Sequence, residues 1–403
     1  MKKNILFVDD EPNILDGIKR MLRPFREAYD IRFCENGSRA LELMGEQPAD
    51  VVVSDMRMPG MDGAALLNHV QQDYPHAIRI MLTGQADDTA VLKTVTVAHQ
   101  FLAKPCAPER LKEVLARATA LHDRLTNGHL KNLVTGIGTL PSLPSVYAKL
   151  QETLKDPEAS LDDVAAIIEQ DMAMTAKLLQ LVNSSFFGLY RKVDSPARAV
   201  KLLGLDTIKV LVLGIQIFSE FKAPGQKAAL ARLWQHSMAV AQCSKRIAME
   251  ASDNLDLISN SFIAGMLHDI GRLLLLSHLG KDYAEIIQTA EKQGIRLETE
   301  EAARLQTTHA DIGAYLIGLW GFNGDIIEAI AFHHRMKELE ADSLTAALAV
   351  HLADHYYYLR YPDQVVGKPP VLDTAYLERL GYAEASAEWM AQCQSLLETD
   401  DDQ

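Results

Sequence analysis

Five side chains in the first quarter of the sequence could together carry out a phosphoryl transfer. Asp55, Asp9 and Asp10 each follow a run of apolar residues, and Thr83 and Lys104 follow two later runs. A carboxylate such as Asp55 can accept a phosphoryl group when nearby positive charge neutralises the transferring oxygens. Asp9 and Asp10 can hold a Mg²⁺ ion that bridges Asp55 and the phosphate. Lys104 would add a positive charge, and Thr83 could donate a hydrogen bond to a phosphoryl oxygen.

The elements that must position these side chains are predicted to be strands of a parallel sheet. The runs occupy residues 5–8, 51–54, 78–82 and 101–102, are apolar apart from Ser54 and Arg79, and alternate with segments of helical pattern. Short apolar runs of this kind are typical of strands buried on both faces. Because all C-terminal strand ends of a parallel sheet lie on one edge, we expect the five polar groups to meet there.

The motifs around these residues resemble the receiver domain of two-component response regulators. They are VDDEP at 8–12, SDMRMPGMDG at 54–63, LTG at 82–84 and KP at 104–105. The resemblance covers residues 1–121. It implies a flavodoxin-like α/β domain with a five-stranded parallel sheet in the order 2-1-3-4-5.

The receiver resemblance also implies a role for each polar group. Asp55 would be the phosphoacceptor and would be phosphorylated through a sensor histidine kinase. The implied Mg²⁺ ligands are Asp9, Asp10 and Asp55. Thr83 and Lys104 would be the switch residue and the charge partner, and Phe101 matches the aromatic residue that rotates in this family. An ordinary buried position in a strand is compatible with that role of Phe101.

Length and composition predict a second, larger part with a different character. A chain of 403 residues, 48% hydrophobic and 23% charged, should form two or three globular domains. Its net charge of −14 argues against DNA as a partner, since the DNA backbone requires a basic face. The longest apolar stretch, residues 208–218, is too short to span a membrane and contains Lys209 and Gln216.

Cysteine usage and the start of the chain predict a cytoplasmic location. The four cysteines are Cys34, Cys106, Cys243 and Cys393. They show neither metal-binding nor redox spacing, which is typical of a reducing compartment. The sequence does not open with a signal-peptide pattern.

The pattern changes beyond Pro108. An apolar stripe with alternating spacings of three and four consists of Leu111, Val114, Ala118, Leu121 and Leu125. It predicts either a long helix that carries the signal out of the receiver or only the last receiver helix with a short tail. A homodimer through the receiver or through this stripe is left open. Glycines and prolines between 136 and 144 predict a domain boundary, after which helical periodicity continues to the end.

Three segments of the helical part resemble the HDOD domain, a helical relative of the HD phosphohydrolases. They are LPSLP at 140–144, IIEQDMAMTAKLLQLVNSSFFG at 167–188 and ARAVKLLGLDTIKVLVLG at 197–214. Taken by themselves, they predict short helices with Asp171 and Asn183 at caps or turns. The predicted buried face consists of Met174, Leu178, Leu181 and Val182. The family usually has proline at the position of Met172.

The expected organisation is therefore a multidomain chain. A receiver (1–121) is followed by a helical linker (122–137) and an all-α HDOD domain (138–345). A helical extension (346–403) would complete an HD-like core.

Seven potential metal ligands are distributed over the helical part. They are His236, His268, Asp269, His309, His333, His334 and Asp354. Imidazole suits first-row transition metals, and a carboxylate shared by two ions builds a binuclear site. The order His, His-Asp, His, His-His, Asp resembles the HD-GYP phosphohydrolases, which hydrolyse cyclic di-GMP. The resemblance implies iron, manganese or another divalent metal. We expect His278 and His351 to be ordinary core or surface residues.

Two departures from HD-GYP enzymes leave two functions open. The residues after the histidine pair read RMKELEADSL, without a Gly-Tyr-Pro loop, and Arg272 replaces a lysine. One function is a response regulator in which phosphorylated Asp55 controls an HDOD module that contacts a signalling protein or senses a ligand. The other is a phosphorylation-gated, metal-dependent phosphodiesterase acting on cyclic di-GMP or another phosphoester. We favour the first because the substrate-binding loop is missing.

Overall fold

The computed structural model describes most of the chain in ten segments. They are residues 2–84, 97–124, 128–137, 141–142, 144–156, 158–183, 193–209, 211–212, 219–220 and 227–401. Several predicted features lie partly outside the described residues, namely residues 138–140, 143, 184–188, 210 and 213–218 and Leu125.

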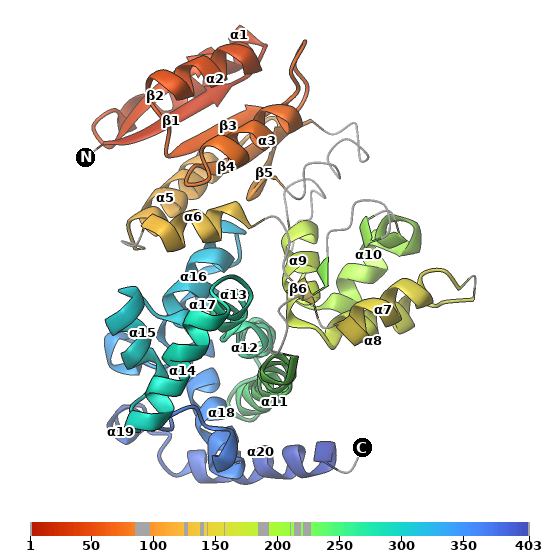
Figure 1. The fold of residues 1–403 in the computed structure, drawn as a ribbon, viewed down its shortest axis with the longest axis vertical. Coiled ribbons are helices and arrows are strands. Elements are labelled where there is room, and N and C mark those ends of the chain that lie inside the picture. The colour runs from red at the N-terminus through yellow and green to blue at the C-terminus, as the bar shows by residue number, and fades with distance from the viewer. Residues whose placement is uncertain are drawn as a thin grey trace.

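The N-terminal part is a five-stranded parallel sheet flanked by helices (Figure 1). Its strands are β1 (Lys3–Val8), β2 (Tyr29–Cys34), β3 (Val51–Asp55), β4 (Ile78–Thr83) and β5 (Gln100–Ala103). They pair in the order β2-β1-β3-β4-β5, which confirms the predicted receiver topology. Every residue of β3 and β4 is buried, as expected for strands rich in β-branched residues and covered on both faces.

Two of the receiver helices begin at a capping side chain. The receiver helices are α1 (Pro12–Met21), the short 3₁₀ helix η1 (Arg23–Phe25), α2 (Gly37–Glu46), α3 (Gly63–Asp73) and α5 (Pro108–Arg124). The side chains of Asn36 and Asp62 accept hydrogen bonds from the third backbone N–H of α2 and α3. Such caps satisfy backbone donors that the first helical turn leaves free.

The rest of the described chain is helical apart from one short strand pair. The helices before the long helix α11 are α6 (Gly128–Gly136), α7 (Pro144–Thr153), α8 (Leu161–Glu169), α9 (Met172–Val182) and α10 (Pro196–Lys209). The strands β6 (Pro141–Ser142) and β7 (Ser219–Glu220) form the pair. Asp171 caps α9 and Asn183 ends it, and the four predicted apolar residues of α9 are buried, so these predictions are confirmed.

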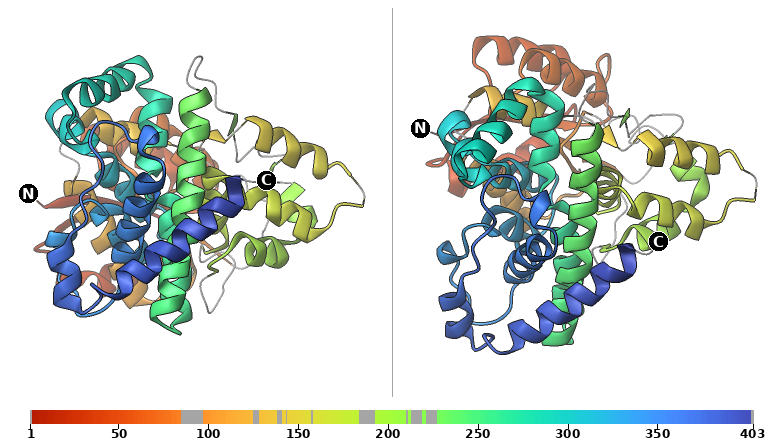
Figure 2. Two further views of the ribbon diagram at one scale, coloured as in Figure 1. Left: turned by 90° about the horizontal axis from the view of Figure 1, so that it is seen from below. Right: turned by 60° about the horizontal axis from the view of Figure 1, so that its bottom comes forward.

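The remaining helices pack around α11. They are α11 (Lys227–Ala251), α12 (Leu255–Leu267), α13 (Ile270–His278), α14 (Lys281–Gln293), α15 (Leu297–Leu305), α16 (His309–Leu319), α17 (Gly324–Phe332), η4 (Met336–Glu338), α18 (Ala346–Arg360), η5 (Pro362–Gln364), α19 (Thr374–Leu380) and α20 (Ala385–Asp401). In both views of Figure 2, helices α7 to α10 lie on one side of α11 and helices α12 to α19 lie mainly on the other.

The apolar stripe of α5 is buried within the chain. Leu111, Val114 and Ala118 are at most 2% exposed, and α5 packs against α16 of the helical part. The structure describes this helix as far as Arg124, and this part packs within the chain as a last receiver helix would. Leu111, Val114 and Ala118 are therefore not available as a dimer surface.

A buried arginine, Arg79, connects the receiver sheet to helix α6. Arg79 is fully buried in β4 and donates hydrogen bonds to the carbonyls of Val97 (2.6 Å), Ala77 (3.1 Å) and Thr135 in α6 (2.6 Å). His99 accepts from the Arg79 backbone N–H through Nδ1, so its Nε2–H donates to Thr135. Burial lowers the pKa of Arg79 to about 9. These contacts satisfy the buried polar groups between the sheet and α6.

Lys177 of α9 is a second buried basic side chain near the receiver. It is 1% exposed, and its Nζ lies 5.0 Å from the centroid of the Trp320 ring. Although an aromatic face favours the charged form, burial dominates and lowers the pKa of Lys177 to about 7.

We expect Lys177→Met to change the pH dependence of stability. Between about pH 7 and pH 10.5 the unfolded chain keeps the lysine proton and the folded chain does not. The stability of the wild type should therefore rise with pH across this window, by about 1.4 kcal/mol per unit. The methionine variant lacks this contribution, so its advantage should be largest near pH 7 and shrink toward pH 10. Urea unfolding at several pH values would measure the difference.

The matched control is Lys149→Met, which alters an exposed lysine of α7. That variant should follow the wild-type pH dependence. Parallel curves for Lys177→Met and the wild type would show that Lys177 stays protonated when buried.

Candidate phosphorylation site and metal centre

The predicted phosphorylation residues meet at the C-terminal edge of the sheet. Asp9, Asp10 and Asp55 each offer a carboxylate oxygen within 4.8 Å of the others, and Asp10 is the most exposed of the three. The Lys104 ammonium lies 2.5 Å from Asp55 Oδ1 and 2.7 Å from Asp9 Oδ2. Thr83 ends β4 and is 2% exposed, and its carbonyl accepts a hydrogen bond from the Lys104 backbone N–H. This is an oxygen-rich site with one cation beside the acceptor carboxylate.

Asp55, the predicted acceptor, is held at the end of β3 by a close backbone approach. A Cβ added to Gly63, the first residue of α3, would lie 2.0 Å from the Asp55 carbonyl oxygen. Only glycine therefore allows α3 to start there. The Arg57 backbone N–H donates to Asp55 Oδ2. Burial raises the pKa of Asp55, and Lys104 opposes that shift. Phe101 is buried in β5, as predicted for either reading of that residue.

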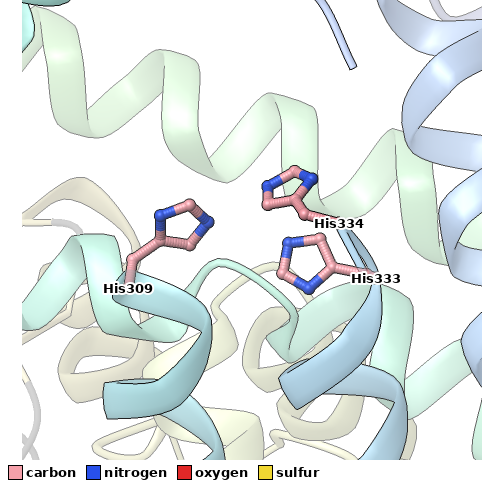
Figure 3. Close-up of side chains that lie close together, drawn as sticks. All are labelled: His309, His333 and His334. Carbon is pink, nitrogen blue, oxygen red and sulfur yellow. The ribbon is translucent and has the colours of Figure 1, made fainter. Parts of the chain in front are cut away.

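The seven predicted ligands in the helical part form one buried group, called here the histidine cluster. His236 lies within α11, and Asp354 lies within α18. The other five lie at helix ends, where His268 ends α12, Asp269 precedes α13, His309 starts α16 and His333 with His334 follows α17. Figure 3 shows the rings of His309, His333 and His334 facing a common space.

The ligand atoms of the cluster lie at distances suited to metal coordination after small adjustments. His236 Nε2 lies 3.0 Å from His268 Nε2 and 3.2 Å from Asp354 Oδ1. Asp269 lies 3.3 Å from His309 Nε2 through Oδ1 and 3.6 Å from His268 Nε2 through Oδ2. Three overlapping sets have atoms within 4.8 Å of one another, namely His309, His333, His334; His236, His268, Asp354; and His268, Asp269, His333. Asp269 is placed between the two histidine groups, as a bridging carboxylate would be.

Hydrogen bonds on the outer side of the imidazoles fix their orientation. The Nδ1 atoms of His268 and His333 lie 2.7 and 2.8 Å from the carbonyls of Gly265 and Ile330. His309 Nδ1 lies 2.7 Å from the carboxylate of Glu301. Each contact leaves Nε2 directed to the cluster interior. Outer partners of this kind select the tautomer and raise the basicity of the ligand nitrogen.

The pKa shifts differ among the residues of the cluster, and so do their protonation states. Burial lowers the pKa of His268 and lowers that of His333 to about 3, so these imidazoles are neutral. Burial would also lower the pKa of His309, but the Glu301 carboxylate outweighs it and raises that pKa to about 9. Burial alone would raise the pKa of Asp269, yet Arg272 holds it well below its ordinary value. His268 and His333 thus supply neutral nitrogens and Asp269 an ionised oxygen, which are the forms that bind metals, and His309 would bind a metal through Nε2 only after releasing its proton.

Unpartnered buried atoms test whether this donor set fits a metal. His309 Nε2, His333 Nε2 and Asp354 Oδ2 are buried and have no hydrogen-bond partner among the described residues. Leaving such atoms unsatisfied is costly. Since imidazole nitrogen and carboxylate oxygen are ligands of first-row transition metals, the residues fit one or two such ions.

A narrow cavity of about 30 Å³ adjoins the histidine cluster and is called here the mouth of the cluster. Its lining includes Arg272, Tyr358 and Lys368. The Arg272 guanidinium donates to Asp269 Oδ2 at 2.7 Å, so it is tied to the carboxylate and not free in the opening. Gly367 has a φ of +72°, and an added Cβ would lie 2.1 Å from the Ile295 carbonyl oxygen. The backbone at the mouth is therefore packed tightly against the α14–α15 connection.

Sequence reasoning missed Glu301. Its Oε2 contacts both the Nδ1 and the backbone N–H of His309, and its Oε1 accepts from the Tyr283 hydroxyl at 2.6 Å. Glu301 lies in an acidic helical segment with no distinguishing spacing, so no local signal identifies it. His278 and His351 were predicted to be ordinary, and their Nδ1 atoms lie near the carbonyls of Leu274 and His333.

We expect Glu301→Gln to weaken metal binding by the cluster about 10- to 100-fold. The amide keeps the size of the side chain but removes the charge that raises the basicity of His309. Competition with a chromophoric chelator would measure the affinity. Glu300→Gln, one residue earlier on α15, is the matched control and should bind like the wild type. Equal affinities of the Glu301 variant and the wild type would contradict a positioning role for Glu301.

Two family models match the chain. Residues 5–116 match the response regulator receiver domain, and residues 140–336 match the HDOD domain. The chain is a response regulator with an HDOD domain. Asp354 lies beyond the matched span, but α18 packs against α11, α12 and α17 and brings it into the cluster.

Known proteins resemble this response regulator in parts. An uncharacterized protein of Treponema pallidum is 27% identical over 200 residues, which is 50% of this chain and 38% of that protein. The response regulator PilR of Pseudomonas aeruginosa is 34% identical over 123 residues, covering 30% of this chain and 27% of PilR. The chain thus spans about a quarter to two fifths of the length of these two curated relatives.

Solved structures of related proteins exist as well. The MmoQ response regulator of Methylococcus capsulatus is 24% identical, with a TM-score of 0.48, and covers 63% of this chain and 97% of that one. An HDOD domain protein of Geobacter sulfurreducens is 25% identical, with a TM-score of 0.41, and covers 69% of this chain and 95% of that one.

The helices were also compared with the requirements of a membrane span. Within the described residues, no helix combines the length and the apolar character needed to cross a bilayer.

Proposed function

We propose that phosphorylation of Asp55 controls the HDOD domain, which acts as a regulatory module whose histidine cluster binds transition metal. Asp55 would be phosphorylated through a sensor histidine kinase with Mg²⁺ held by Asp9 and Asp10. The phosphate would add a charge of about −1.5 to −2 beside Lys104 and Thr83. Phe101 would change its orientation with them. That change would shift an equilibrium between arrangements of the two domains.

The observation that supports a regulatory role over turnover is the closed mouth of the cluster. The cavity there has about 30 Å³, whereas pockets for drug-sized ligands measure roughly 300–1,000 Å³. A cyclic dinucleotide needs the larger space. Arg272 is tied to Asp269, and the sequence after His334 lacks a Gly-Tyr-Pro loop.

A metal-dependent phosphodiesterase is the second candidate. The completeness of the cluster favours it, because all seven predicted ligands lie together and Asp269 is placed to bridge. A bound metal pair would supply Lewis acidity and lower the pKa of a bridging water. Within the chain, Glu301 would orient His309, and Lys368 would attract an anionic phosphoester to the mouth.

The partners follow from the same features. The net charge of −14 favours a protein or small-molecule partner over DNA. A downstream signalling protein or a cyclic nucleotide fits the regulatory role, and the cytoplasm is the expected location. The metal content of the full chain, measured by mass spectrometry beside a variant without His268 and Asp269, tests the cluster. Phosphorylation of the full chain beside Asp55→Asn tests the receiver.

A further inference from the structure

Helix α16 contacts the receiver at one end and belongs to the histidine cluster at the other. Its first residue is His309, and the helix packs against α5 and α6. Figure 1 shows α16 directly beneath these two helices. With a rise of about 1.5 Å per residue, its eleven residues span about 16 Å. One rigid element therefore bridges the two sites.

At the C-terminal end of α16, receiver side chains hold the backbone. Gln100 Nε2 donates to the Gly318 carbonyl at 3.5 Å, and Arg117 Nη1 donates to the Phe322 carbonyl at 2.9 Å. Gly321 has a φ of +76°, and a Cβ added there would lie 3.4 Å from the Gln100 side chain. The chain after α16 is thus fixed relative to both β5 and α5.

Strand β5 connects this contact with the phosphorylation site. Gln100 is its first residue, and Lys104 directly follows its last. Lys104 pairs with Asp55 through its ammonium and with the Thr83 carbonyl through its backbone N–H. A phosphoryl group on Asp55 would take the ammonium as its own charge-assisted partner. Because Gln100 and Lys104 are connected by the short strand β5, a movement of Lys104 would displace Gln100.

At the N-terminal end, α16 cannot move without disturbing two cluster residues. A Cβ added to Gly271 of α13 would lie 2.0 Å from the His309 carbonyl oxygen and 3.0 Å from the Gly313 nitrogen. The two helix backbones are therefore in direct contact. Asp269 immediately precedes α13. Displacement of α16 would change the position of His309 relative to Asp269.

We propose that α16 couples Asp55 to the histidine cluster, so that an acyl phosphate on Asp55 weakens transition-metal binding by the cluster. This inference rests on the proposal that the cluster binds metal. The arrangement that pairs Lys104 with Asp55 also holds His309 beside Asp269. A phosphoryl group that favours another position of β5 shifts the population away from that arrangement. By thermodynamic reciprocity, metal in the cluster weakens binding of a phosphoryl analogue at Asp55 by the same factor.

The test measures the affinity of the full chain for Zn²⁺ by competition with a chromophoric chelator. Excess Mg²⁺ fills the receiver site, and beryllofluoride serves as the phosphoryl analogue. We expect Zn²⁺ binding to weaken about fivefold or more when beryllofluoride is added, since allosteric couplings usually amount to about 5- to 150-fold. The double variant Gln100→Ala, Arg117→Ala should bind Zn²⁺ but lose this response.

Arg110→Ala is the matched control for the double variant. Arg110 lies on the same helix and pairs with Glu113, as Arg117 does. Arg110 takes part in none of the contacts with α16 described above. The control should keep the full response to beryllofluoride. A double variant that also keeps it would overturn the route through α16.

The possible failures can be told apart. If the wild type binds no more Zn²⁺ than a variant lacking His268 and Asp269, the metal proposal itself is wrong. If Zn²⁺ binds the cluster with the same or higher affinity in the presence of beryllofluoride, the metal proposal stands and the coupling is refuted.

Discussion

Asp55→Asn should abolish phosphorylation of the chain. In the wild type, incubation with acetyl phosphate and Mg²⁺ should produce an acyl phosphate that is visible as an added mass on the intact protein. The amide nitrogen and oxygen of asparagine are too weakly nucleophilic to replace the carboxylate. The neighbouring groups Asp9 and Lys104 remain in place but have no acceptor to serve. We therefore expect the added mass to fall to background.

Measuring the stability of Asp55→Asn distinguishes loss of the phosphoryl acceptor from loss of the fold. Because burial raises the folded-state pKa of Asp55 above its unfolded value, any stability from its protonated form is lost as the pH rises through the folded pKa. At pH 7 the ionised carboxylate is thus less favourable than a neutral group. Asp55→Asn should unfold at a temperature no lower than that of the wild type.

Asp73→Asn is the matched control, since this exposed residue ends α3 on the same domain. It should be phosphorylated like the wild type. An Asp55→Asn chain that still gains the full mass would place the acceptor at another residue.

Replacing both His268 and Asp269 with alanine should remove the transition metal from the chain. The wild type, purified after supply with iron or manganese, should carry about two such ions if the cluster forms a binuclear site. His268 belongs to two of the three overlapping ligand sets and Asp269 to one of them. Asp269 also lies 3.3 Å from His309 Nε2, so we expect the double replacement to weaken both metal positions. Mass spectrometry of the full chain would measure the content, and Mg²⁺ in the receiver does not interfere because it is counted separately.

Metal removal should also lower the stability of the wild type. A ligand present at about 100 times its dissociation constant stabilises the folded state by about 2.7 kcal/mol. A chelator should therefore lower the unfolding temperature of the wild type and leave the double variant unchanged. Circular dichroism would confirm that the variant is folded.

His278→Ala is the control, because His278 lies outside the cluster and contacts the Leu274 carbonyl. It should retain the metal of the wild type. A folded wild type that binds no iron, manganese or zinc would refute the metal centre and leave contact between proteins as the route of signalling.

Residue patterns were sufficient to predict the receiver site, because its residues lie at or next to the ends of short strands that the sequence itself indicates. Four of the receiver's five strands contain the predicted apolar runs and end at or next to the site residues, and parallel pairing places those ends side by side. Asp9, Asp55 and Lys104 therefore had to meet once the strands formed. The caps of α9 were predictable for the same reason, since a cap depends only on the residues next to it.

The histidine cluster was only partly predictable. The types and the order of its ligands are visible in the sequence, but their convergence requires α11, α12, α16, α17 and α18 to pack together. Helical periodicity indicates which face of a helix is apolar and not which other helix that face meets. The Glu301 support of His309 depends on how α15 lies against the start of α16, and no local pattern encodes that.

The sequence by itself determined the buried receiver strands and the identity of the candidate phosphorylation residues and candidate metal ligands, because these depend on residue type and local periodicity. Its resemblance to receiver domains implied the strand order. Tertiary structure decided which surfaces are hidden. It buried the α5 stripe, placed Arg79 and Lys177 in the interior, and set α16 between the receiver and the cluster. These outcomes depend on contacts between segments far apart in the chain, where shape and burial select one partner among many apolar faces.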